Sequence, residues 1–530
     1  MNKVKILFAV ILSFLTLLSY SQTLEVVEWG TFKELEKNTS FQKIVGHDED
    51  GFYAVSSEGK GEINRKQLWL EYYSNLTFTI EAKNEIILPS VGGIATEFEK
   101  MFYLKNKLIL FTTATNEQTE KKYLYVQYLE QNGQLKNKPK KVGEIPIGSD
   151  KVDEFKLILT ENKSKIFLSY HSEFMQYNDE PFTFKIIDTK LKIEFDEEFI
   201  LPLKDKKFTV VKTDVGESGN FYILVKAVQE EKRKSSRGKK AAKYDNIMLV
   251  YNMEKEEFKT YDIKMQKYIP TNVLFTLNDN EEVVICGFFS AKTQKVAGQF
   301  LGAFYKKIDP RIEKFLPVPG KKFDFLVFDK AFLTVNAQER NGVDPKDYNN
   351  YILKDLLMLS NGGFTLLAEN YFITEKTFLN PKTKEEVLLI YHNYNDIIAV
   401  GVNKKGKMDW AQRIAKNQNS LDDNGYYSSY AATVELTKLK IIFNDHKANA
   451  KKDKLPEKTK QIKFMPAKSP KAVPFVVTIY TDGSFEKDMI FPGKDAKNVF
   501  VPRLFYNTGE NYFTYGQKGK TYRFGSFVFE

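Results

Sequence analysis

Short runs of β-branched and aromatic residues recur along the whole chain, and Asn, Asp, Gly and Lys separate them. Runs of this kind, roughly four to eight residues long and bounded by turn residues, predict β-strands. Apolar residues with helical spacing do not extend over any long window of the chain after its first 21 residues. The pattern therefore predicts an almost entirely β protein.

The predicted strands fall into groups of four, each spanning roughly 50 residues. The first group consists of residues 51–55, 68–73, 77–80 and 86–89. Four further groups occupy residues 100–147, 155–203, 208–263 and 272–318. A sixth contains residues 353–359, 364–369, 387–391 and 397–402, followed by 410–414, and a seventh extends over 428–491.

The last segment offers three strands, at residues 499–506, 512–515 and 522–529. A fourth is available at residues 24–29, near the N-terminus. A four-stranded sheet cannot bury its own two faces, whereas a ring of such sheets buries both. We therefore expect an all-β fold, a β-propeller with eight blades, whose ring is closed by pairing of the N- and C-terminal strands. Seven blades is the alternative, if one group is an insertion.

The chain begins with a basic stretch, an apolar segment at residues 6–18, and small residues before Gln22. This layout is typical of a secretory signal peptide at residues 1–21. We expect residues 22–530 to form a single domain that does not span a membrane. The only cysteine, Cys286, lies among Ile and Phe residues, which indicates a buried side chain rather than a nucleophile.

The net charge of +10 is concentrated in two predicted loops, at residues 230–244 and 446–470. Residues 232–243 carry +7 and residues 447–463 carry +5, so the remainder of the chain is close to neutral. Clustered cations attract polyanions, and this candidate surface contains Lys232, Arg233, Lys234, Arg237, Lys239, Lys240, Lys451 and Lys452. The loops lack interleaved aromatic residues, so nucleic acid is not expected. Residues 310–350 are predicted to form an irregular connection.

No nucleophile elbow, phosphate loop or zinc motif is present, and no two of the four histidines have metal-ligand spacing. We therefore predict no catalytic residue, metal or cofactor. The turns at residues 48–51 and 422–425 are rich in acids, but their Asp, Asn and Gly residues also suit tight turns. Calcium at either turn remains an open alternative.

Polar residues are densest between residues 361 and 449. A binding site there would use Glu369, Tyr371, Asp396, Trp410, Tyr427 and Asp445. The competing interpretation is that these polar groups connect neighbouring blades through hydrogen bonds.

The same region carries the strings NGGFTLLAENYF (361–372), YNDIIAVGVNKKGKMDWAQRIAKNQ (394–418), YYSSYA (426–431) and IIFNDHKAN (441–449). These strings resemble uncharacterised exported β-propeller-like proteins of Bacteroidota. The resemblance is best over residues 350–450. It implies a protein of the cell envelope and no catalytic residues.

Three functions are compatible with the sequence. The first is a non-enzymatic protein-binding scaffold of the cell envelope, periplasmic rather than extracellular, which would serve as an accessory subunit of an outer-membrane transport or secretion complex. The second is a carbohydrate-binding or carbohydrate-active protein with its site at the mouth of the ring. The third is polyanion binding through the lysine-rich loops. The sequence favours binding over catalysis without excluding an enzyme.

Overall fold

The computed structural model describes residues 26–59, 63–147, 155–160, 163–171, 181–203, 208–228, 244–291, 300–311, 314–315, 323–328, 350–421, 423, 425–450, 459–464, 472–490 and 498–529. The only helices in these ranges are single 3-10 turns, η2 (Lys447–Asn449) and η5 (Pro502–Leu504). No helix in these ranges is both long enough and apolar enough to cross a membrane. The candidate signal peptide and all eight candidate polyanion-binding residues lie outside the described residues.

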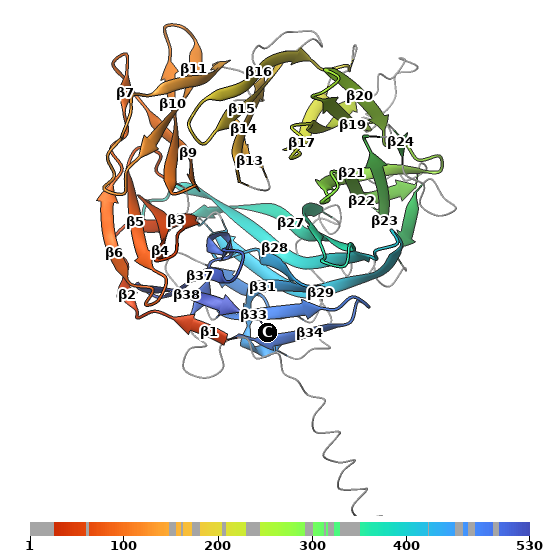
Figure 1. Cartoon of the computed structure of the whole chain (residues 1–530). Helices are drawn as coiled ribbons and strands as arrows, with labels where there is room; N and C mark the ends of the chain where they lie inside the picture. The colour runs from red at the N-terminus through yellow and green to blue at the C-terminus, as the bar shows by residue number, and fades with distance from the viewer. Residues whose placement is uncertain are drawn as a thin grey trace, which may run out of the picture.

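Eight sheets, antiparallel except for one strand of the sixth and here called blades 1 to 8, follow one another along the chain (Figure 1). Blade 1 contains β3 (Thr39–His47), β4 (Gly51–Glu58), β5 (Leu68–Ser74) and β6 (Ile80–Glu85). Blade 2 contains β9 (Glu97–Leu104), β10 (Lys107–Asn116), β11 (Lys121–Leu129) and β12 (Lys140–Pro146). Blade 3 contains β13 (Lys156–Leu159), β14 (Lys165–His171), β15 (Pro181–Asp188) and β16 (Ile193–Ile200). Blade 4 contains β17 (Phe208–Val215), β18 (Phe221–Val228), β19 (Tyr244–Asn252) and β20 (Glu257–Asp262).

The later blades carry additional strands. Blade 5 contains β21 (Tyr268–Leu277), β22 (Val283–Ala291), β23 (Gly302–Asp309), β24 (Lys314–Phe315) and β25 (Asp324–Val327). Blade 6 contains β26 (Tyr351–Met358), β27 (Phe364–Leu379), β28 (Glu386–Val402), β29 (Met408–Leu421) and the parallel strand β32 (Ile462–Phe464). Blade 7 contains β30 (Ala431–Glu435), β31 (Lys438–His446), β33 (Ala472–Ile479) and β34 (Phe485–Met489).

Blade 8 unites the two ends of the described chain. Its strands are β35 (Val499–Phe500), β36 (Tyr506–Asn507), β37 (Tyr512–Lys518), β38 (Thr521–Val528), β1 (Val26–Trp29) and β2 (Lys33–Glu34). The expected terminal pairing is present, because β1 lies antiparallel to β38 from Val26↔Val528 to Trp29↔Gly525. A separate short hairpin, β7 (Ser90–Val91) with β8 (Ile94–Ala95), lies between blades 1 and 2.

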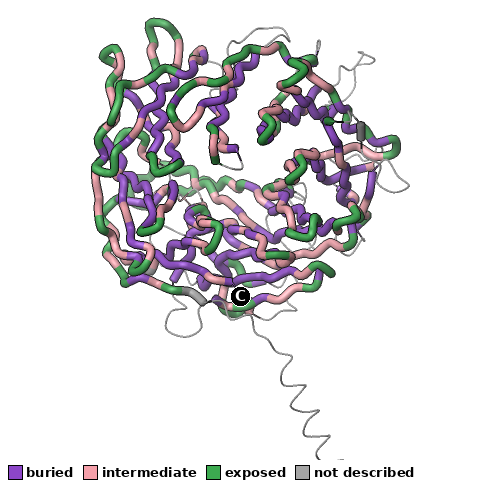
Figure 2. Tube along the Cα trace, in the orientation of Figure 1, coloured by how far each residue is buried: buried purple, intermediate pink, exposed green. Residues whose placement is uncertain are grey.

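An apolar cluster fills each interface between successive blades. Alternate residues of a strand point to opposite faces, so Leu108 and Leu110 of β10 pack toward blade 1 whereas Ile109 and Phe111 pack toward blade 3. The cluster that contains Phe41 joins blade 1 to blade 8. Figure 2 shows the result, with buried residues along the strands and exposed residues mainly at turns and outer edges. This packing around a common axis is that of a β-propeller.

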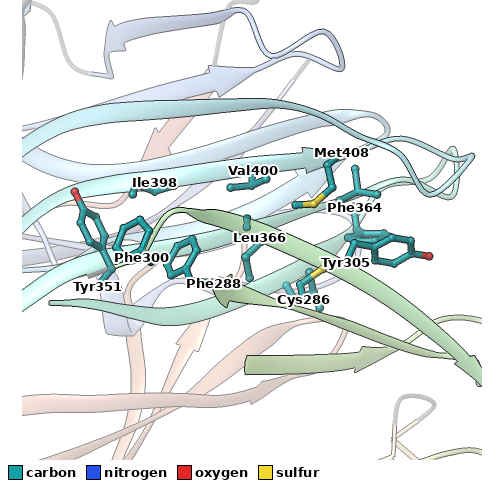
Figure 3. Packing of buried hydrophobic residues seen from close by; sticks show 14 of the residues in the cluster. Cys286, Phe288, Phe300, Tyr305, Tyr351, Phe364, Leu366, Ile398, Val400 and Met408 are labelled. Carbon is teal, nitrogen blue, oxygen red and sulfur yellow. The ribbon is translucent and has the colours of Figure 1, made fainter. Parts of the chain in front are cut away.

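Cys286 occupies one of these interfaces. It lies on β22 and is fully buried in the cluster between blades 5 and 6, beside Leu366 and Tyr305 (Figure 3). Burial raises the pKa of its thiol, which disfavours the reactive thiolate. The expectation of a buried apolar cysteine is confirmed.

Several predicted strand positions were wrong, although the eight groups are present. Blade 1 begins with β3, which the sequence did not indicate, and residues 86–89 follow its last strand. Blade 3 ends with β16 at Ile193–Ile200 rather than with residues 199–203. In blade 6, residues 387–391 and 397–402 belong to one strand. Most of the expected irregular connection at 310–350 lies outside the described residues, and its described part includes β25, which pairs with β23.

Candidate functional site

The residues that the sequence singled out lie on blades 6 and 7 or between them. Glu369 and Tyr371 belong to β27, Asp396 to β28, Trp410 to β29 and Asp445 to β31, and Tyr427 precedes β30.

Glu369 lies in a buried ion-pair cluster. Its Oε1 accepts a hydrogen bond of 2.7 Å from Lys416 Nζ, and its Oε2 is 2.5 Å from Lys354 Nζ. The hydroxyl of Ser429 donates to Oε2 at 2.8 Å. Desolvation opposes ionisation of Glu369, but the ammonium groups of Lys416 and Lys354 outweigh it and lower the pKa of Glu369. The carboxylate is therefore ionised and its oxygens already have partners.

The other two carboxylates also have buried partners. Asp396 accepts from Arg413 Nε at 2.6 Å and from the hydroxyl of Tyr351. Asp445 accepts from Lys487 Nζ at 2.6 Å and from Asn449 Nδ2 at 2.7 Å. The three carboxylates thus form three separate charge clusters and do not converge on a common pocket.

The aromatic candidates make contacts within the protein as well. Trp410 Nε1 donates to the carbonyl of Thr481 at 3.0 Å, which connects blade 6 to the β33–β34 turn of blade 7. The hydroxyl of Tyr371 lies 2.8 Å from His392 Nδ1. Tyr427 stacks on Phe464 of β32. The contacts of Trp410 and Tyr427 join blade 6 to the chain of blade 7, whereas the Tyr371–His392 contact lies within blade 6.

A large groove lies elsewhere, where the turns of blades 8, 1 and 2 meet. Its volume is about 1000 Å³, and a second hollow of about 580 Å³ continues it and shares Tyr103, Asn106 and Gln131 with it. The walls come from the β3–β4 and β5–β6 turns, the β9–β10 turn, and residues 508–511 before β37. These blades are neighbours in Figure 1, where blade 2 lies at the upper left, blade 1 at the left and blade 8 at the lower left. We call the larger hollow alone the acidic groove, since the lining of the second hollow includes Lys107 and Lys136 as well as Glu130.

Five carboxylates line the acidic groove, and no described Lys or Arg does so. They are Glu28, Asp48, Glu49, Asp50 and Glu510. None of the five forms an ion pair with another described residue. Carboxylates gathered in a concave surface produce a negative potential that attracts cations.

Asp48 holds the floor of the groove in place. Its Oδ1 accepts from the Tyr72 hydroxyl at 2.7 Å and from the Gly51 amide at 2.8 Å. Its Oδ2 accepts from the hydroxyls of Tyr53 and Tyr103 at 3.3 and 3.4 Å. Burial and the charge of Asp48 raise the pKa of Tyr103 to about 12, so this phenol remains a donor. Asp48 therefore acts as a structural anion with its acceptors occupied.

His47 stands at the edge of the groove beside the rings of Tyr506 and Phe513. Burial, followed by the positive charge of Lys163, lowers the pKa of His47. Its Nδ1 is buried and has no hydrogen-bond partner among the described residues. The imidazole is therefore neutral at neutral pH and does not offset the negative charge of the groove.

Metal binding was an open alternative for the Asp48–Gly51 turn. No three His, Cys, Asp or Glu side chains in the described ranges lie close enough together to hold a metal ion. The turn is stabilised by its own hydrogen bonds, including Asn75 Nδ2 to the carbonyl of Asp48 at 3.2 Å. Asp422 and Asn424 of the other acidic turn lie outside the described residues.

Sequence reasoning did not find the acidic groove. The sequence indicated only the Asp48–Gly51 turn as a candidate, because its acidic residues are adjacent in the chain. Glu28 and Glu510 lie 482 positions apart and are brought together by the pairing of the chain ends.

No family model matches the chain. No curated protein matches it either. Among solved structures, a protein of unknown function from Dyadobacter fermentans shares 10% identity at a TM-score of 0.32, covering 68% of this chain and 93% of its own. The β-propeller domain of the Trilobed protease from Pyrococcus furiosus shares 11% identity at a TM-score of 0.33, covering 87% and 100%.

An α-L-arabinanase from Penicillium chrysogenum, solved with arabinobiose, shares 8% identity at a TM-score of 0.31, covering 74% of this chain and 98% of its own. Likenesses this distant carry no information on activity. The assignment of the fold depends on the eight sheets and their packing.

Proposed function

We propose that this protein is a non-enzymatic binding module that holds a basic polypeptide segment in the acidic groove. The observation that carries the proposal is the set of five carboxylates with no described Lys or Arg in the lining. Ammonium and guanidinium groups are the protein side chains that complement such a surface. A binding function for polypeptides agrees with the scaffold role that the sequence favours.

The groove is prepared for a ligand before binding. Asp48 fixes the β3–β4 turn through three tyrosine hydroxyls and the amide of Gly51. Glu49 and Asp50 project from this same turn. A binding surface that is already ordered loses little conformational entropy on association.

A titration with fluorescent hexa-arginine tests this proposal. We expect micromolar binding at low salt that weakens at least about tenfold toward 0.3 M salt, since screening is strong at that concentration. The triple variant Glu28→Gln/Glu49→Gln/Glu510→Gln should lose at least about tenfold in affinity. Hexa-glutamate should not bind.

The matched control removes three carboxylates from other blades, as Glu197→Gln/Glu198→Gln/Glu254→Gln. These side chains are exposed and lie outside the groove. Equal weakening by both triple variants would show that only net charge matters, and the groove would lose its assigned role.

Oligosaccharide binding in the same groove is the second candidate. The amides of Asn75, Asn106, Asn511 and Gln131 line the groove, and amide groups are suitable partners for sugar hydroxyls. Binding of a neutral oligosaccharide would not depend on salt. Salt-independent binding of such a sugar, with no binding of hexa-arginine, would favour this candidate.

We further propose that the protein is exported to the periplasm. The basic, apolar and small-residue segments at positions 1–21 support this. N-terminal sequencing of the native protein should yield Gln22 as its first residue, whereas Met1 would contradict export through cleavage.

A further inference from the structure

The hairpin of β27 and β28 is unusual in its length. These strands have 16 and 17 residues, whereas the corresponding strands of blade 2 have 10 and 9. β26 pairs with β27 only as far as Asn370, and β29 pairs with β28 as far as Tyr391. Residues 373–390 therefore extend beyond the rest of blade 6, and we call them the apolar hairpin. Its long strands are visible in Figure 1.

The apolar hairpin concentrates the exposed apolar surface of the molecule. Of the sixteen large hydrophobic residues that are exposed in the described chain, six lie on it. They are between 38% and 56% exposed, and they are Ile373, Phe378, Leu379, Val387, Leu388 and Ile390. Exposed apolar residues that gather in this way mark an interaction site, whereas scattered ones do not.

The pairing of β27 with β28 shows which exposed apolar residues lie on the same face of the hairpin. Glu375 lies opposite Ile390, Thr377 opposite Leu388, and Leu379 opposite Glu386. Residues directly opposite each other share a face. Ile373, Leu379, Leu388 and Ile390 therefore form one aliphatic face of the hairpin.

The charged groups on this face are all acidic. Glu375 and Glu386 flank the four aliphatic side chains, and neither forms an ion pair with any other residue in the described ranges. His392, at the base of the same face, is occupied by the hydroxyl of Tyr371. Lys376 belongs to the opposite face, where its ammonium lies 5.7 Å from the ring centre of Tyr391.

We propose that the aliphatic face of the apolar hairpin docks an amphipathic, basic segment of a partner protein. Leucine-like side chains of the partner would cover the four aliphatic residues, and its Lys or Arg side chains would pair with Glu375 and Glu386. This surface is distinct from the acidic groove. The turns that line the groove join the first strand of a blade to the second, or the third to the fourth. The apolar hairpin joins the second strand of blade 6 to the third, and such turns lie at the opposite end of a blade.

The acidic charge of the aliphatic face favours a basic partner segment over a second copy of the chain and over a lipid bilayer. A second copy of the chain, packed face to face, would bring four carboxylates together, and like charges oppose association. A bilayer with anionic headgroups would repel the same carboxylates. The turn of the hairpin also carries Lys382, Lys384 and Glu385, which oppose insertion of the tip into hydrocarbon.

The base of the hairpin is held rigidly. The rings of Tyr371 and Tyr394 lie 4.8 Å apart. Asn419 Nδ2 donates to Asn393 Oδ1 at 2.9 Å, and this bond joins β29 to β28. A rigid base presents the aliphatic face in one orientation and reduces the entropy lost on docking.

A designed helical peptide of Leu and Lys residues is the probe for this proposal. Fluorescence anisotropy is measured on the full mature chain in the Glu28→Gln/Glu49→Gln/Glu510→Gln background, so that the acidic groove does not contribute. We expect micromolar binding that weakens at least about tenfold in Leu388→Ser/Ile390→Ser and in Glu375→Gln/Glu386→Gln. A peptide with Glu in place of Lys should bind much more weakly.

The control variant is Leu436→Ser. Leu436 is the second most exposed hydrophobic residue among those described, and it lies in the β30–β31 turn, at the other end of a blade. Equal binding by all variants would overturn the proposal, as would a preference for the Glu peptide. Two further results would overturn it in favour of another occupant: self-association in analytical ultracentrifugation that Leu388→Ser/Ile390→Ser abolishes, or vesicle binding that the same variant abolishes.

Discussion

Buried ion pairs connect strands within blade 6 and within blade 7. Glu369 and Lys416 are both fully buried, and Asp445 and Lys487 form a second buried pair in blade 7. A buried pair gives little net stability relative to apolar residues, because both ions lose their hydration. Removing one partner is costly, however, because the other charge stays buried without its counter-ion.

Glu369→Gln should therefore destabilise the protein by about 3 kcal/mol or more. The ammonium of Lys416 would retain the carbonyl of Tyr394 and the side chain of Gln418 as partners, but no carboxylate. Thermal unfolding followed by calorimetry is the measurement. The double variant Glu369→Leu/Lys416→Met, which removes both charges, should be less destabilised than Glu369→Gln.

The exposed substitution Glu197→Gln provides the control and should change stability by no more than about 0.5 kcal/mol. A Glu369→Gln protein that unfolds at the same temperature as the parent would show that the pair is accessible to water in solution.

At the scale of strands and turns, the sequence predicted the grouping well and some individual strands poorly. β4 and β10 are nearly continuous apolar runs with polar ends, so their positions were clear. β3 was missed because it contains two register shifts, at Phe41/Lys43 and at Ile44/Gly46, which disturb the alternation of apolar and polar residues.

The continuity of β28 was hidden for a different reason. Residues 392–396 separate the two predicted strands and read as a turn, since they include two Asn and one Asp. In the fold residues 392–394 are paired with both β27 and β29, Asn395 is paired with β29, and Asp396 lies at a register shift. Asn395 Nδ2 donates to Asn370 Oδ1 at 3.1 Å. A buried polar strand requires partners from neighbouring strands, and a single sequence does not reveal such partners.

The sequence likewise revealed the unusual residues of the candidate sites but not their partners. Each carboxylate at residues 369, 396 and 445 was recognisable as unusual, but its cationic partner came from another strand. The acidic groove could not be predicted at all, because three blades contribute its walls.

At the scale of the whole molecule, the first and last described strands share one blade. β1 is paired with β38, and the guanidinium of Arg523 lies 4.6 Å from the ring centre of Trp29. Glu28, on the same short strand, is one of the carboxylates of the acidic groove. The pairing of the chain ends therefore contributes both to the stability of blade 8 and to the proposed binding site.

A truncation series tests this double role. A protein that starts at Gln22 retains β1 and should keep full stability and full affinity for hexa-arginine. A protein that starts at Gly30 lacks β1 but keeps β2, so residues 525–528 of β38 lose their partner strand on that edge while Thr521 and Tyr522 stay paired. Unpaired strand edges promote aggregation. We expect the unfolding temperature of this shortened protein to fall by several degrees and its affinity for hexa-arginine to decrease, because Glu28 is lost as well.

The variant Glu28→Gln separates the two effects, since it removes the charge and leaves the strand in place. It should bind hexa-arginine more weakly and unfold at the parental temperature. If the protein that starts at Gly30 were as stable as the one that starts at Gln22, the pairing of β1 with β38 would not contribute to the stability of the ring. Unchanged affinity in Glu28→Gln would remove that carboxylate from the groove's binding surface and restrict the binding carboxylates to the turns of blades 8 and 1.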